Sequence, residues 1–447
     1  MKAPNDALLT DLYQLTMLKA YFDHGMTGTA VFEFFVRRMP EERAFLVAVG
    51  LQQAFEYLET LAPSDADRAF LAKTGRFDDD FIRRLGELRF RGDVDAVPEG
   101  TVVFENEPIL RVTAPLPEAQ FVETRLINLL HFQMVIGSKA VRSVLAAQGR
   151  TLVDFGLRRA HGAEAGLLSA RASYLAGFNG TATVLAGMHF DIPLYGTMGH
   201  SFIETHGSEA QALERFARAH PRGTTLLIDT YDTENAARIV ATLAPLLERE
   251  GVRIGGVRID SGDLAAHASA VRRILDAAGL KSIRIFASAS LDEYAVRDLL
   301  ARGAPIDGFG VGTKMNTSAD APYLDCVYKL QEYAGRPKRK VSEDKATWPG
   351  RKQVYRQRDG AGVMTGDTVT TLDDVQPGEA LLVPVMRAGR RVASTEALDR
   401  IRGRVAEQVA SLPPALRSLD AAPRYPVTIA PALRALAARA DADREAH

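Results

Sequence analysis

Short apolar runs and longer amphipathic stretches alternate along the middle of the chain. The apolar runs close on polar or glycine-rich residues, in segments 151–159, 192–202, 224–233, 253–259, 282–290 and 306–314. Between them the apolar residues recur with helical spacing, at 163–176, 208–219, 234–249, 264–278 and 291–302. Strands that alternate with helices of this length are typical of βαβ units with a parallel sheet. The run of consecutive units favours an α/β fold with a closed (β/α) barrel over an open sheet.

The flanking regions have less regular patterns and predict two further parts. Before the barrel we predict a helix, a strand, a second helix and strand-like pieces, at 5–24, 29–36, 45–61 and 93–113. After residue 335 a basic, turn-rich run leads into strand-like segments and a helical tail. We interpret the basic run as a solvated loop in preference to a phosphate-contacting arm at a subunit interface. The predicted domains are an N-terminal α+β domain at 1–117, the barrel at 118–335, and a C-terminal segment at 336–447 that packs on the N-terminal domain.

Composition narrows the class of protein. The 447 residues carry a net charge of −1, which argues against a general nucleic-acid binder because such proteins are basic. The single cysteine, Cys326, excludes a disulfide framework, and its apolar neighbours favour a small core residue over a nucleophile. No apolar run approaches the length of a membrane span, and the N-terminal residues lack the apolar core of a signal peptide. We therefore expect a cytoplasmic protein without membrane or nucleic-acid partners.

The turn that ends the apolar run RIGGVRI holds charges that a helix start does not explain. Arg258 and Asp260 alternate at the end of this otherwise apolar strand, and Ser261 and Asp263 follow. Ser261 or Asp263 fits the cap of the helix predicted at 264–278. Capping does not account for Arg258 and Asp260, since buried charges cost free energy unless they are paired and so mark functional sites. A polyanionic sugar phosphate suits this combination.

Other candidate residues share this position at the carboxyl end of a predicted strand, where the chemistry of (β/α) barrels lies. These residues are Arg158, His200, Asp229, Arg258, Asp260 and Gly310. His200 stands between small residues that keep its ring accessible, which suits a general base or nucleophile, although a lone histidine is more often structural. Its neighbours His161, His189 and His206 do not provide the helical i, i+4 partner of a zinc site.

Two further segments suit a planar anion and a phosphate. Phe155 offers an aromatic face, and Arg158 a guanidinium that can grip a carboxylate. Taken alone, exposed arginines at a helix start explain that pattern better. The glycine-rich turn Gly308–Thr313 lets backbone N–H groups approach a phosphate. Its spacing matches neither the dinucleotide-binding nor the P-loop pattern, and a tight strand-to-helix turn is an equally good interpretation.

These motifs together resemble the nicotinate phosphoribosyltransferase family. The resemblance begins at LLTDLYQLTM, residues 8–17, and continues in the family's order through FEFFVRR, FGLRRAHG, GTMGHSF, LIDTYDT, VRIDSGDL and GFGVGTKM. It implies a type II phosphoribosyltransferase fold, an irregular (β/α) barrel with a flanking α+β domain, in a homodimer with shared active sites. It also implies that nicotinate and phosphoribosyl diphosphate form nicotinate mononucleotide and diphosphate. The implied reaction is of the ligase class, coupled to ATP hydrolysis through a phosphohistidine, with Mg²⁺ as cofactor, and it salvages nicotinate into NAD.

The resemblance assigns roles to the matching positions. His200 is similar to the histidine that ATP phosphorylates, and with Arg258 and Asp260 it forms the implied catalytic set. The implied nicotinate-binding residues are Tyr13, which reaches across the dimer, Phe155, Arg158, Thr197 and Arg258. The implied phosphoribosyl diphosphate-binding residues are Arg37 (or Arg38), Asp260, Ser261, Gly262, Gly310, Gly312 and Thr313. The chain departs from the family at Phe286–Ser290, where relatives commonly have a Ser-Gly-Asp-type tip.

The chemistry of the candidate residues agrees with this reaction. Departure of diphosphate builds positive charge on the ribose, which Asp260 can stabilise, while Arg258 or Arg37 stabilises the departing anion. The ring nitrogen of nicotinate is already a nucleophile, so no strong base is required.

Three alternatives remain at the level of the sequence. Nicotinamide phosphoribosyltransferases share most of these motifs but carry an Asp where this chain has Ala182, and an Asp there would repel the carboxylate of nicotinate. Quinolinate phosphoribosyltransferases need further cations for a second carboxylate, and the LLTDLYQLTM opening is foreign to them. A barrel that only binds a nucleotide or a protein is disfavoured because His200, Arg258, Asp260 and Asp263 are all present.

Overall fold

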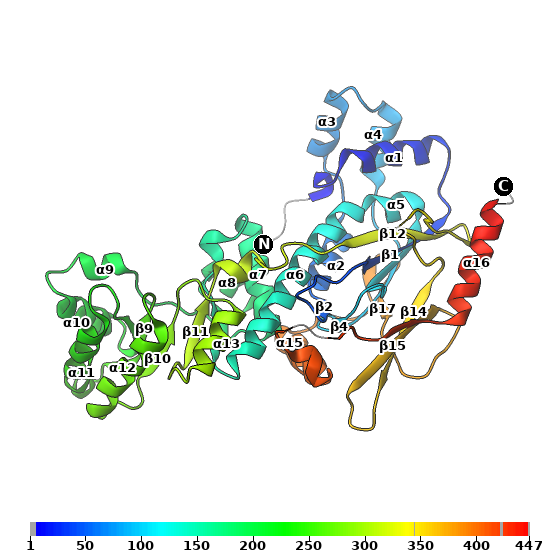
Figure 1. The fold of residues 1–447 in the computed structure, drawn as a ribbon. Coiled ribbons are helices and arrows are strands. Elements are labelled where there is room, and N and C mark those ends of the chain that lie inside the picture. Colours follow the sequence, from blue (N-terminus) through cyan, green and yellow to red (C-terminus); the bar gives the residue numbers. More distant parts are fainter. Residues whose placement is uncertain (1–5, 344, 421–422, 446–447) are drawn as a thin grey trace. The chain divides into compact units, whose positions relative to one another are not determined.

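The chain forms two compact units (Figure 1). This computed structural model describes residues 6–343, 345–420 and 423–445. The first unit comprises Met1–Ser138 with Tyr323–His447, and the second comprises Lys139–Pro322. These limits differ from the predicted boundaries at 117/118 and 335/336, because the elements next to those boundaries pack on strands of the first unit.

The second unit is built on a six-stranded parallel sheet in the order β7-β6-β11-β10-β9-β8. The strands are β6 Thr151–Asp154, β7 Gly180–Thr181, β8 Arg222–Leu227, β9 Arg253–Ile259, β10 Arg284–Ala287 and β11 Gly308–Val311. Every neighbouring pair is parallel. The carboxyl ends of all six strands therefore lie along one edge, which brings together the turns that the sequence singled out.

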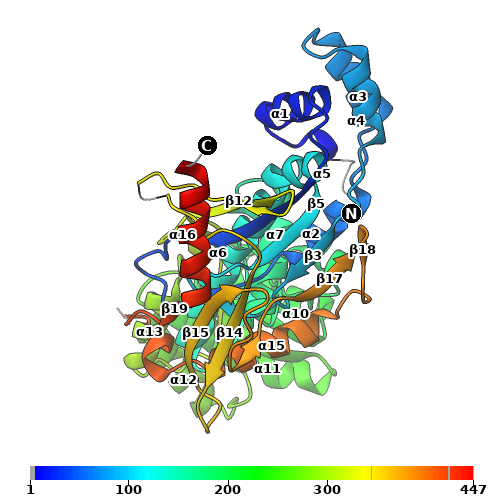
Figure 2. The same ribbon diagram turned by 90° about the vertical axis from the view of Figure 1, so that its right-hand side faces the viewer.

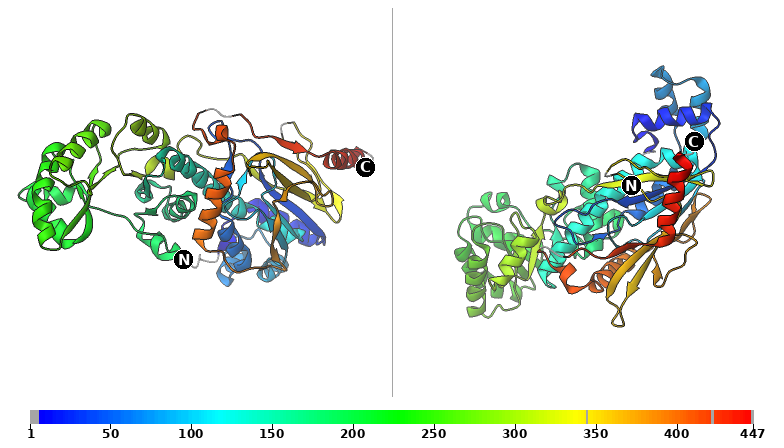
Figure 3. Two further views of the ribbon diagram at one scale, coloured as in Figure 1. Left: turned by 90° about the horizontal axis from the view of Figure 1, so that it is seen from below. Right: turned by 45° about the vertical axis from the view of Figure 1, so that its right-hand side comes forward.

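Helices connect these strands, and the five predicted helices are confirmed. The helices are α7 Ala163–Ala176, α8 Val184–Phe190, α9 His200–Glu204, α10 Glu209–Ala219, α11 Thr233–Arg249, α12 Leu264–Ala277, α13 Glu293–Ala301 and α14 Thr313–Asn316. Side chains cap the starts of α10 to α13, through Ser208, Asp232, Asp263 and Asp292. Helices α10, α11 and α12 pack side by side and against β8, β9 and β10, in the green part of Figure 3.

The strand predicted at 192–202 is wrong. Pro193 has no N–H to donate, and this segment makes only the isolated parallel bridge between Thr181 and Leu194 before α9 begins at His200. Within the described residues, β7 and β8 form the two ends of the sheet and do not pair with each other. The expected closure is therefore incomplete, and the barrel is irregular.

The first unit contains a seven-stranded sheet in the order β13-β12-β1-β5-β3-β17-β18 (Figure 2). Its strands are β1 Thr29–Val36, β3 Asp93–Ala96, β5 Leu110–Pro115, β12 Cys326–Tyr333, β13 Arg336–Pro337, β17 Val383–Arg387 and β18 Arg390–Arg391. Strand β1 confirms the prediction at 29–36 and is buried from Ala30 to Val36. It pairs with β12 and β5, so strands from both ends of the chain share this core.

Helices and two smaller sheets complete the first unit. The helices are α1 Leu12–Asp23, α2 Leu51–Thr60, α3 Asp65–Lys73, α4 Asp79–Glu87, α5 Leu116–Phe121, α15 Leu398–Ala410 and α16 Pro431–Glu445, while α6 Glu123–Ala147 continues into the second unit. The helix predicted at 45–61 is wrong at its start. Strand β2 Leu46–Val47 pairs there with β4 Val102–Val103, and Gly50, at a φ of 100°, separates β2 from α2.

The C-terminal strands join the first unit. Strand β17 pairs with β3, and a four-stranded sheet has the order β16-β14-β15-β19, with strands Glu379–Ala380, Lys352–Arg358, Met364–Thr371 and Val427–Ile429. The interpretation of 336–356 as a solvated loop is wrong at its end, because Lys352 is buried against Glu33 at 2.7 Å. Burial raises the pKa of the Cys326 thiol to about 12, which agrees with a packing residue.

Candidate active site

The turn after β9 brings two carboxylates together at the carboxyl edge of the second unit's sheet. The Asp260 backbone N–H donates to Asp229 Oδ2 at 2.8 Å, and Ser261 Oγ donates to the same oxygen at 2.6 Å. Asp260 Oδ1 accepts a hydrogen bond from Ser288 Oγ. The other oxygen of Asp229 is buried and has no hydrogen-bond partner among the described residues. That oxygen can accept a donor or a cation that a ligand brings into the site.

The helix cap falls to Asp263, one of the two residues that the sequence offered for it. Asp263 Oδ1 accepts from the backbone N–H groups of Ala265 and Ala266 at 3.1 and 3.2 Å. Its carboxylate also lies 2.9 Å from Arg302 Nη2, and this bond to Arg302 is the main cause of the lowered pKa of Asp263. Asp263 therefore caps the start of α12, whereas Arg258 and Asp260 take no part in the cap and are available to bind a ligand.

His200 begins α9 and faces side chains from two other strand ends. Its Nδ1 lies 3.1 Å from Thr230 Oγ1, and its Nε2 lies 3.8 Å from Asp260 Oδ2. The side chain is 40% exposed. When Nδ1–H donates to Thr230, the lone pair is on Nε2, which faces the site. The predicted convergence of His200 and Asp260 is therefore present in the structure.

Arg258 is a partly buried cation with a spare donor. Its Nη1 donates to Thr197 Oγ1 at 2.7 Å, whereas its Nε is buried without a hydrogen-bond partner in the part of the chain that the structure describes. Burial lowers the pKa of Arg258, the carboxylates of Asp260 and Asp229 raise it, and the charge of Arg158 lowers it. Arg158 is thus close enough for the two cations to act on each other. Such a pair suits an anionic ligand.

Phe155 follows β6 and packs against the glycines of the neighbouring turn. A Cβ on Gly310 would lie 2.5 Å from the Phe155 ring, and one on Gly312 would lie 2.8 Å from its carbonyl oxygen. The Phe155 and Phe286 rings are 6.0 Å apart at an angle of 44°. Gly310 and Gly312 are therefore required for the close approach of Phe155, independently of any contact with a phosphate.

Asp154 ties this segment to two other strand ends. Its Oδ1 accepts from the Gly156 N–H at 2.9 Å and from Asn316 Nδ2 at 2.8 Å, and its Oδ2 accepts from Thr181 Oγ1 at 2.8 Å. Its own carbonyl accepts from the Ala182 N–H at 2.8 Å. Burial raises the pKa of Asp154, while these side-chain and backbone donors lower it. Asp154 therefore fixes both the Phe155 turn and the Ala182 turn.

The remaining predicted phosphate-contacting residues lie on neighbouring turns of the second unit. Thr313 Oγ1 accepts from Arg159 Nη1 at 3.2 Å. Gly262 adopts a φ of 74°, and a Cβ there would lie 2.6 Å from His267 Nε2, so this position requires glycine. With Ser261 already bonded to Asp229, these turns form a polar edge beside Asp260.

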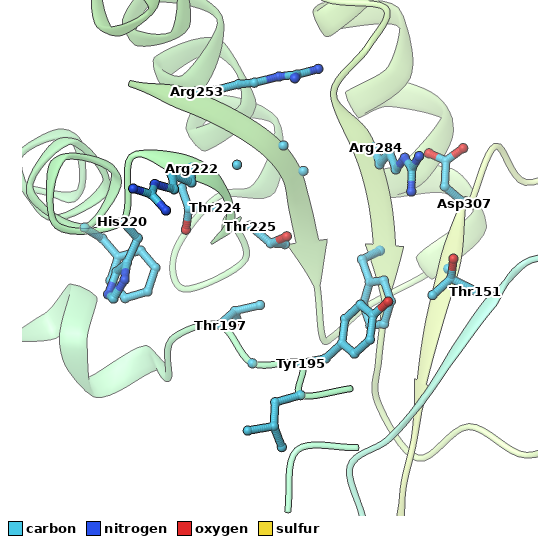
Figure 4. Close-up of a pocket in the computed structure, with 18 of the residues that line it drawn as sticks. Thr151, Tyr195, Thr197, His220, Arg222, Thr224, Thr225, Arg253, Arg284 and Asp307 are labelled. Carbon is cyan, nitrogen blue, oxygen red and sulfur yellow. The ribbon is translucent and has the colours of Figure 1, made fainter. Parts of the chain in front are cut away.

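A cavity of about 1210 Å³ lies against the same sheet (Figure 4). Phe155, Tyr195 and Thr197 line it near the carboxyl edge. Arg222, Arg253 and Arg284, which begin three neighbouring strands, line it at the amino edge. Since Thr197 also accepts from Arg258, the cavity adjoins the cation pair.

Two predicted site residues belong to the first unit. Tyr13 lies in α1 and is 46% exposed. Arg37 follows β1, its Nη1 is 3.7 Å from Asp325 Oδ1, and its Nε is buried without a hydrogen-bond partner among the described residues. Their roles in binding stay predictions.

Sequence reasoning missed three residues that shape this site. Asp154 is an acid at a buried strand end, the same signal that singled out Asp260. Thr230 follows Asp229, which the sequence placed at a strand tip without a role. Ser288 lies in the tip that departs from the family pattern, and it supplies the hydrogen bond to Asp260.

No group of three or more His, Cys, Asp or Glu side chains is arranged to hold a metal ion in the part of the chain that the structure describes. None of its helices combines the length and apolar character needed to cross a membrane.

Comparison with known proteins extends over nearly the whole chain. Three family models match: the nicotinate phosphoribosyltransferase N-terminal domain at residues 8–131, the nicotinate phosphoribosyltransferase family at 150–358, and its C-terminal domain at 376–437. The chain is 48% identical to nicotinate phosphoribosyltransferase pncB2 of Mycobacterium tuberculosis, covering 95% of this chain and 91% of that protein. It is 40% identical to the nicotinate phosphoribosyltransferase of Bacillus subtilis, covering 78% and 73%.

A solved structure confirms the fold class. The crystal structure of human nicotinic acid phosphoribosyltransferase superposes with a TM-score of 0.87 at 28% identity, covering 96% of this chain and 99% of that one. The irregular α/β barrel with a flanking domain is therefore an architecture shared with that enzyme.

Proposed function

The chain belongs to the nicotinate phosphoribosyltransferase family, and from this premise we propose that it joins nicotinate to the ribose of phosphoribosyl diphosphate. The products are nicotinate mononucleotide and diphosphate. The observation that carries the proposal is Arg258, a half-buried cation whose Nη1 donates to Thr197 Oγ1 at 2.7 Å, because Thr197 lines the cavity together with Phe155. A flat aromatic carboxylate matches this arrangement, because guanidinium groups bind carboxylates and a phenyl ring stacks on a heterocycle.

Discrimination between nicotinate and nicotinamide follows from the charged groups around the proposed nicotinate pocket. Arg258 has an unpartnered buried Nε to offer an anion. Ala182, on the turn held by Asp154, presents no carboxylate that would repel the acid. A neutral amide would leave the cations without a counter-charge, so nicotinate is the favoured substrate.

The transfer step uses the electrons of nicotinate itself. The lone pair of the pyridine nitrogen forms the bond to C1 of the ribose, and the C1–oxygen bond breaks with its electron pair leaving on diphosphate. Positive charge that develops on the ribose is stabilised by Asp260, whose carboxylate is held by Ser288 and by the backbone bond to Asp229. No proton has to be removed from nicotinate, so the site needs orientation and charge rather than a strong base.

Mg²⁺ fits the carboxylates present. This ion typically binds one or two carboxylates together with substrate phosphates, and Asp229 has a buried oxygen without a partner beside Asp260. Bound there, Mg²⁺ would supply neutralisation of the diphosphate charge.

Coupling to ATP is assigned to His200. In the tautomer whose Nδ1–H donates to Thr230 Oγ1, the lone pair is on Nε2, which faces the site. That lone pair can form a bond to the terminal phosphorus of ATP while the bond to ADP breaks. Hydrolysis of the phosphohistidine would then couple ATP cleavage to the transfer, which places the enzyme in the ligase class and in the salvage of nicotinate toward NAD. The same proposal includes a homodimer in which Tyr13 of each subunit reaches the active site of the other subunit.

The direct test is product formation by the purified full chain. Radiolabelled nicotinate is incubated with phosphoribosyl diphosphate and Mg²⁺, with and without ATP. We expect labelled nicotinate mononucleotide and an equal amount of diphosphate, with faster formation and release of ADP when ATP is present. The absence of labelled mononucleotide under both conditions would overturn the transferase function. Formation of nicotinate mononucleotide at the same rate with and without ATP would overturn only the ATP coupling.

A further inference from the structure

The cavity beside the active site continues to the opposite edge of the sheet. Phe155 and Thr197 belong to the carboxyl-edge end, whereas Arg222, Arg253 and Arg284 are the first residues of β8, β9 and β10. Figure 4 shows Tyr195 and Thr197 on one side of the cavity and Arg253 on the other. The cavity therefore offers a path between the two edges of the sheet.

Glycines form part of the wall between these ends, beside Thr225 and Phe286. Gly255, Gly256 and Gly308 line the cavity along β9 and at the start of β11. A Cβ on Gly308 would lie 2.8 Å from the Phe286 ring, and one on Gly255 would lie 2.8 Å from the Gly223 carbonyl oxygen. A side chain at either position would force neighbouring atoms to shift, so both positions require glycine.

The amino-edge rim has an excess of positive charge. Arg222 and Arg253 are paired in register on adjacent strands, and Arg284 begins the next strand. All three are exposed, and among the described residues none has a carboxylate within 4.0 Å. Other arginines of the second unit do have such partners, as Arg218 has Glu250.

One carboxylate, Asp307, stands on the same rim. Its Oδ2 accepts a hydrogen bond from the Ile285 N–H at 2.8 Å, so this carboxylate is bonded to the backbone at the start of β10. The rim thus presents three cations against one acid. Side chains that carry a net charge at the mouth of a cavity attract counter-ions and raise association rates by roughly 10–1000-fold.

We propose that nicotinate reaches its pocket through this amino-edge mouth, where Arg222, Arg253 and Arg284 attract its carboxylate. This inference rests on the proposed function, which places phosphoribosyl diphosphate at the carboxyl edge beside Asp260. With that substrate bound, the amino-edge mouth gives nicotinate a separate approach to Phe155 and Arg258. The rim arginines contribute to capture of the substrate and take no part in the transfer step.

The test uses charge removal on the full enzyme. The variant Arg222→Gln/Arg253→Gln/Arg284→Gln should lower kcat/KM for nicotinate by about tenfold at low ionic strength. Its kcat and its kcat/KM for phosphoribosyl diphosphate should match the wild type. Added salt should lower kcat/KM for nicotinate in the wild type and have little effect in the variant, because salt screens exposed charges. Arg249→Gln, an exposed arginine outside the cavity, is the matched control for the single variant Arg253→Gln and should behave as the wild type.

The outcomes separate the entry route from the function. A triple variant with wild-type kcat/KM for nicotinate and wild-type salt dependence would overturn the route while leaving the function intact. An equal loss of kcat/KM in Arg253→Gln and Arg249→Gln would also overturn it, because the effect would then come from net charge. If the triple variant fails to fold, Arg253→Glu and Arg249→Glu provide the same comparison at single exposed positions. Wild-type enzyme that does not turn over nicotinate would defeat the proposed function itself.

Discussion

At the scale of single residues, the site depends on side chains in which one nitrogen atom contacts the protein and another faces the site. His200 uses Nδ1 for Thr230 and directs Nε2 at the site, and Arg258 uses Nη1 for Thr197 while its Nε stays unpartnered within the described residues. In each case one polar atom fixes the orientation and another is left for a ligand. Such an arrangement pre-organises the site before substrate arrives.

The first prediction concerns His200. His200→Ala should abolish nicotinate-dependent ADP formation and leave a slower, ATP-independent transfer, because the transfer step uses the lone pair of nicotinate rather than the histidine. Both products are measured in one assay. Ser201→Ala, the exposed neighbour in α9, serves as the control and should keep its ATP coupling. ATP coupling at wild-type level in His200→Ala would remove the histidine from the mechanism.

A second residue-scale prediction concerns Ala182. Ala182→Asp should lower kcat/KM for nicotinate at least tenfold, because like charges placed together cost several kcal/mol. The loss for nicotinamide should be smaller, so the ratio of the two specificity constants shifts toward the amide. Ala182→Asn adds a similar volume without charge and separates repulsion from crowding. If the Asp and Asn variants lose activity with both substrates in equal proportion, Ala182 is a packing residue.

At the scale of elements, one buried carboxylate links three turns. Asp154 at the end of β6 accepts from Gly156, from Thr181 at the end of β7, and from Asn316 at the end of α14. A Cβ on Gly156 would lie 1.8 Å from Asn316 Nδ2, so the turns fit tightly. Phe155 and Ala182 both sit on turns that this carboxylate holds. Their positions therefore depend on Asp154 although it lies beneath the site.

Asp154→Ala should accordingly raise KM for nicotinate and lower stability, since each donor left unpaired costs about 1–3 kcal/mol. Asp154→Asn keeps acceptors for two of the donors and should recover most of the affinity. Thermal unfolding and steady-state kinetics are measured for both variants. Ser208→Ala, which removes only the cap of α10 at about 1 kcal/mol, should lower stability without changing KM. An unchanged KM for nicotinate in a folded Asp154→Ala would show that the carboxylate does not position the site.

At the scale of the whole molecule, sequence patterns predicted the second unit better than the first. Its helices and its strands follow local periodicity, and β9 occupies 253–259 as predicted. The failures have identifiable causes. Pro193 interrupts a strand-like run, Gly50 divides a predicted helix, and β12 leaves the predicted barrel domain because it pairs with β1. Pairing between distant segments is set by tertiary contacts, which local periodicity does not encode.

The same division applies to the site. Charged residues at strand ends, such as Asp260, stand out in the sequence because they interrupt apolar runs. Ser288 and Thr230 do not, since small hydroxyl residues are common in turns and gain their role only through the partner that the fold brings close. The glycine-rich pattern predicts phosphate binding by Gly310 and Gly312, whereas the structure gives both a packing role beside Phe155.

Stability on this scale should depend on pH through a buried acid of the first unit. Burial, followed by the nearby charge of Asp367, raises the pKa of Glu107 well above its ordinary value of 4.5. The folded state therefore keeps a proton that the unfolded state releases, and stability falls as the pH rises from that value toward the folded-state pKa. The slope is at most about 1.4 kcal/mol per pH unit.

Glu107→Gln should remove this contribution, because a neutral amide has no proton to lose. The variant should gain stability relative to the wild type as the pH rises, as measured by urea unfolding across the pH range. Asp93→Asn, a half-buried strand position outside this cluster, provides the comparison. Parallel pH profiles for the wild type and Glu107→Gln would contradict a proton held by Glu107.

The proposed function requires that Arg258, together with Arg158, selects a pyridine carboxylate over the neutral amide. It is tested most directly by the ratio of kcat/KM for nicotinate to kcat/KM for nicotinamide in the purified wild-type enzyme, at equal phosphoribosyl diphosphate, Mg²⁺ and ATP. A buried charged contact contributes about 2–5 kcal/mol, so we expect a preference for nicotinate of at least tenfold. Equal use of the two substrates, or a preference for nicotinamide, would contradict it.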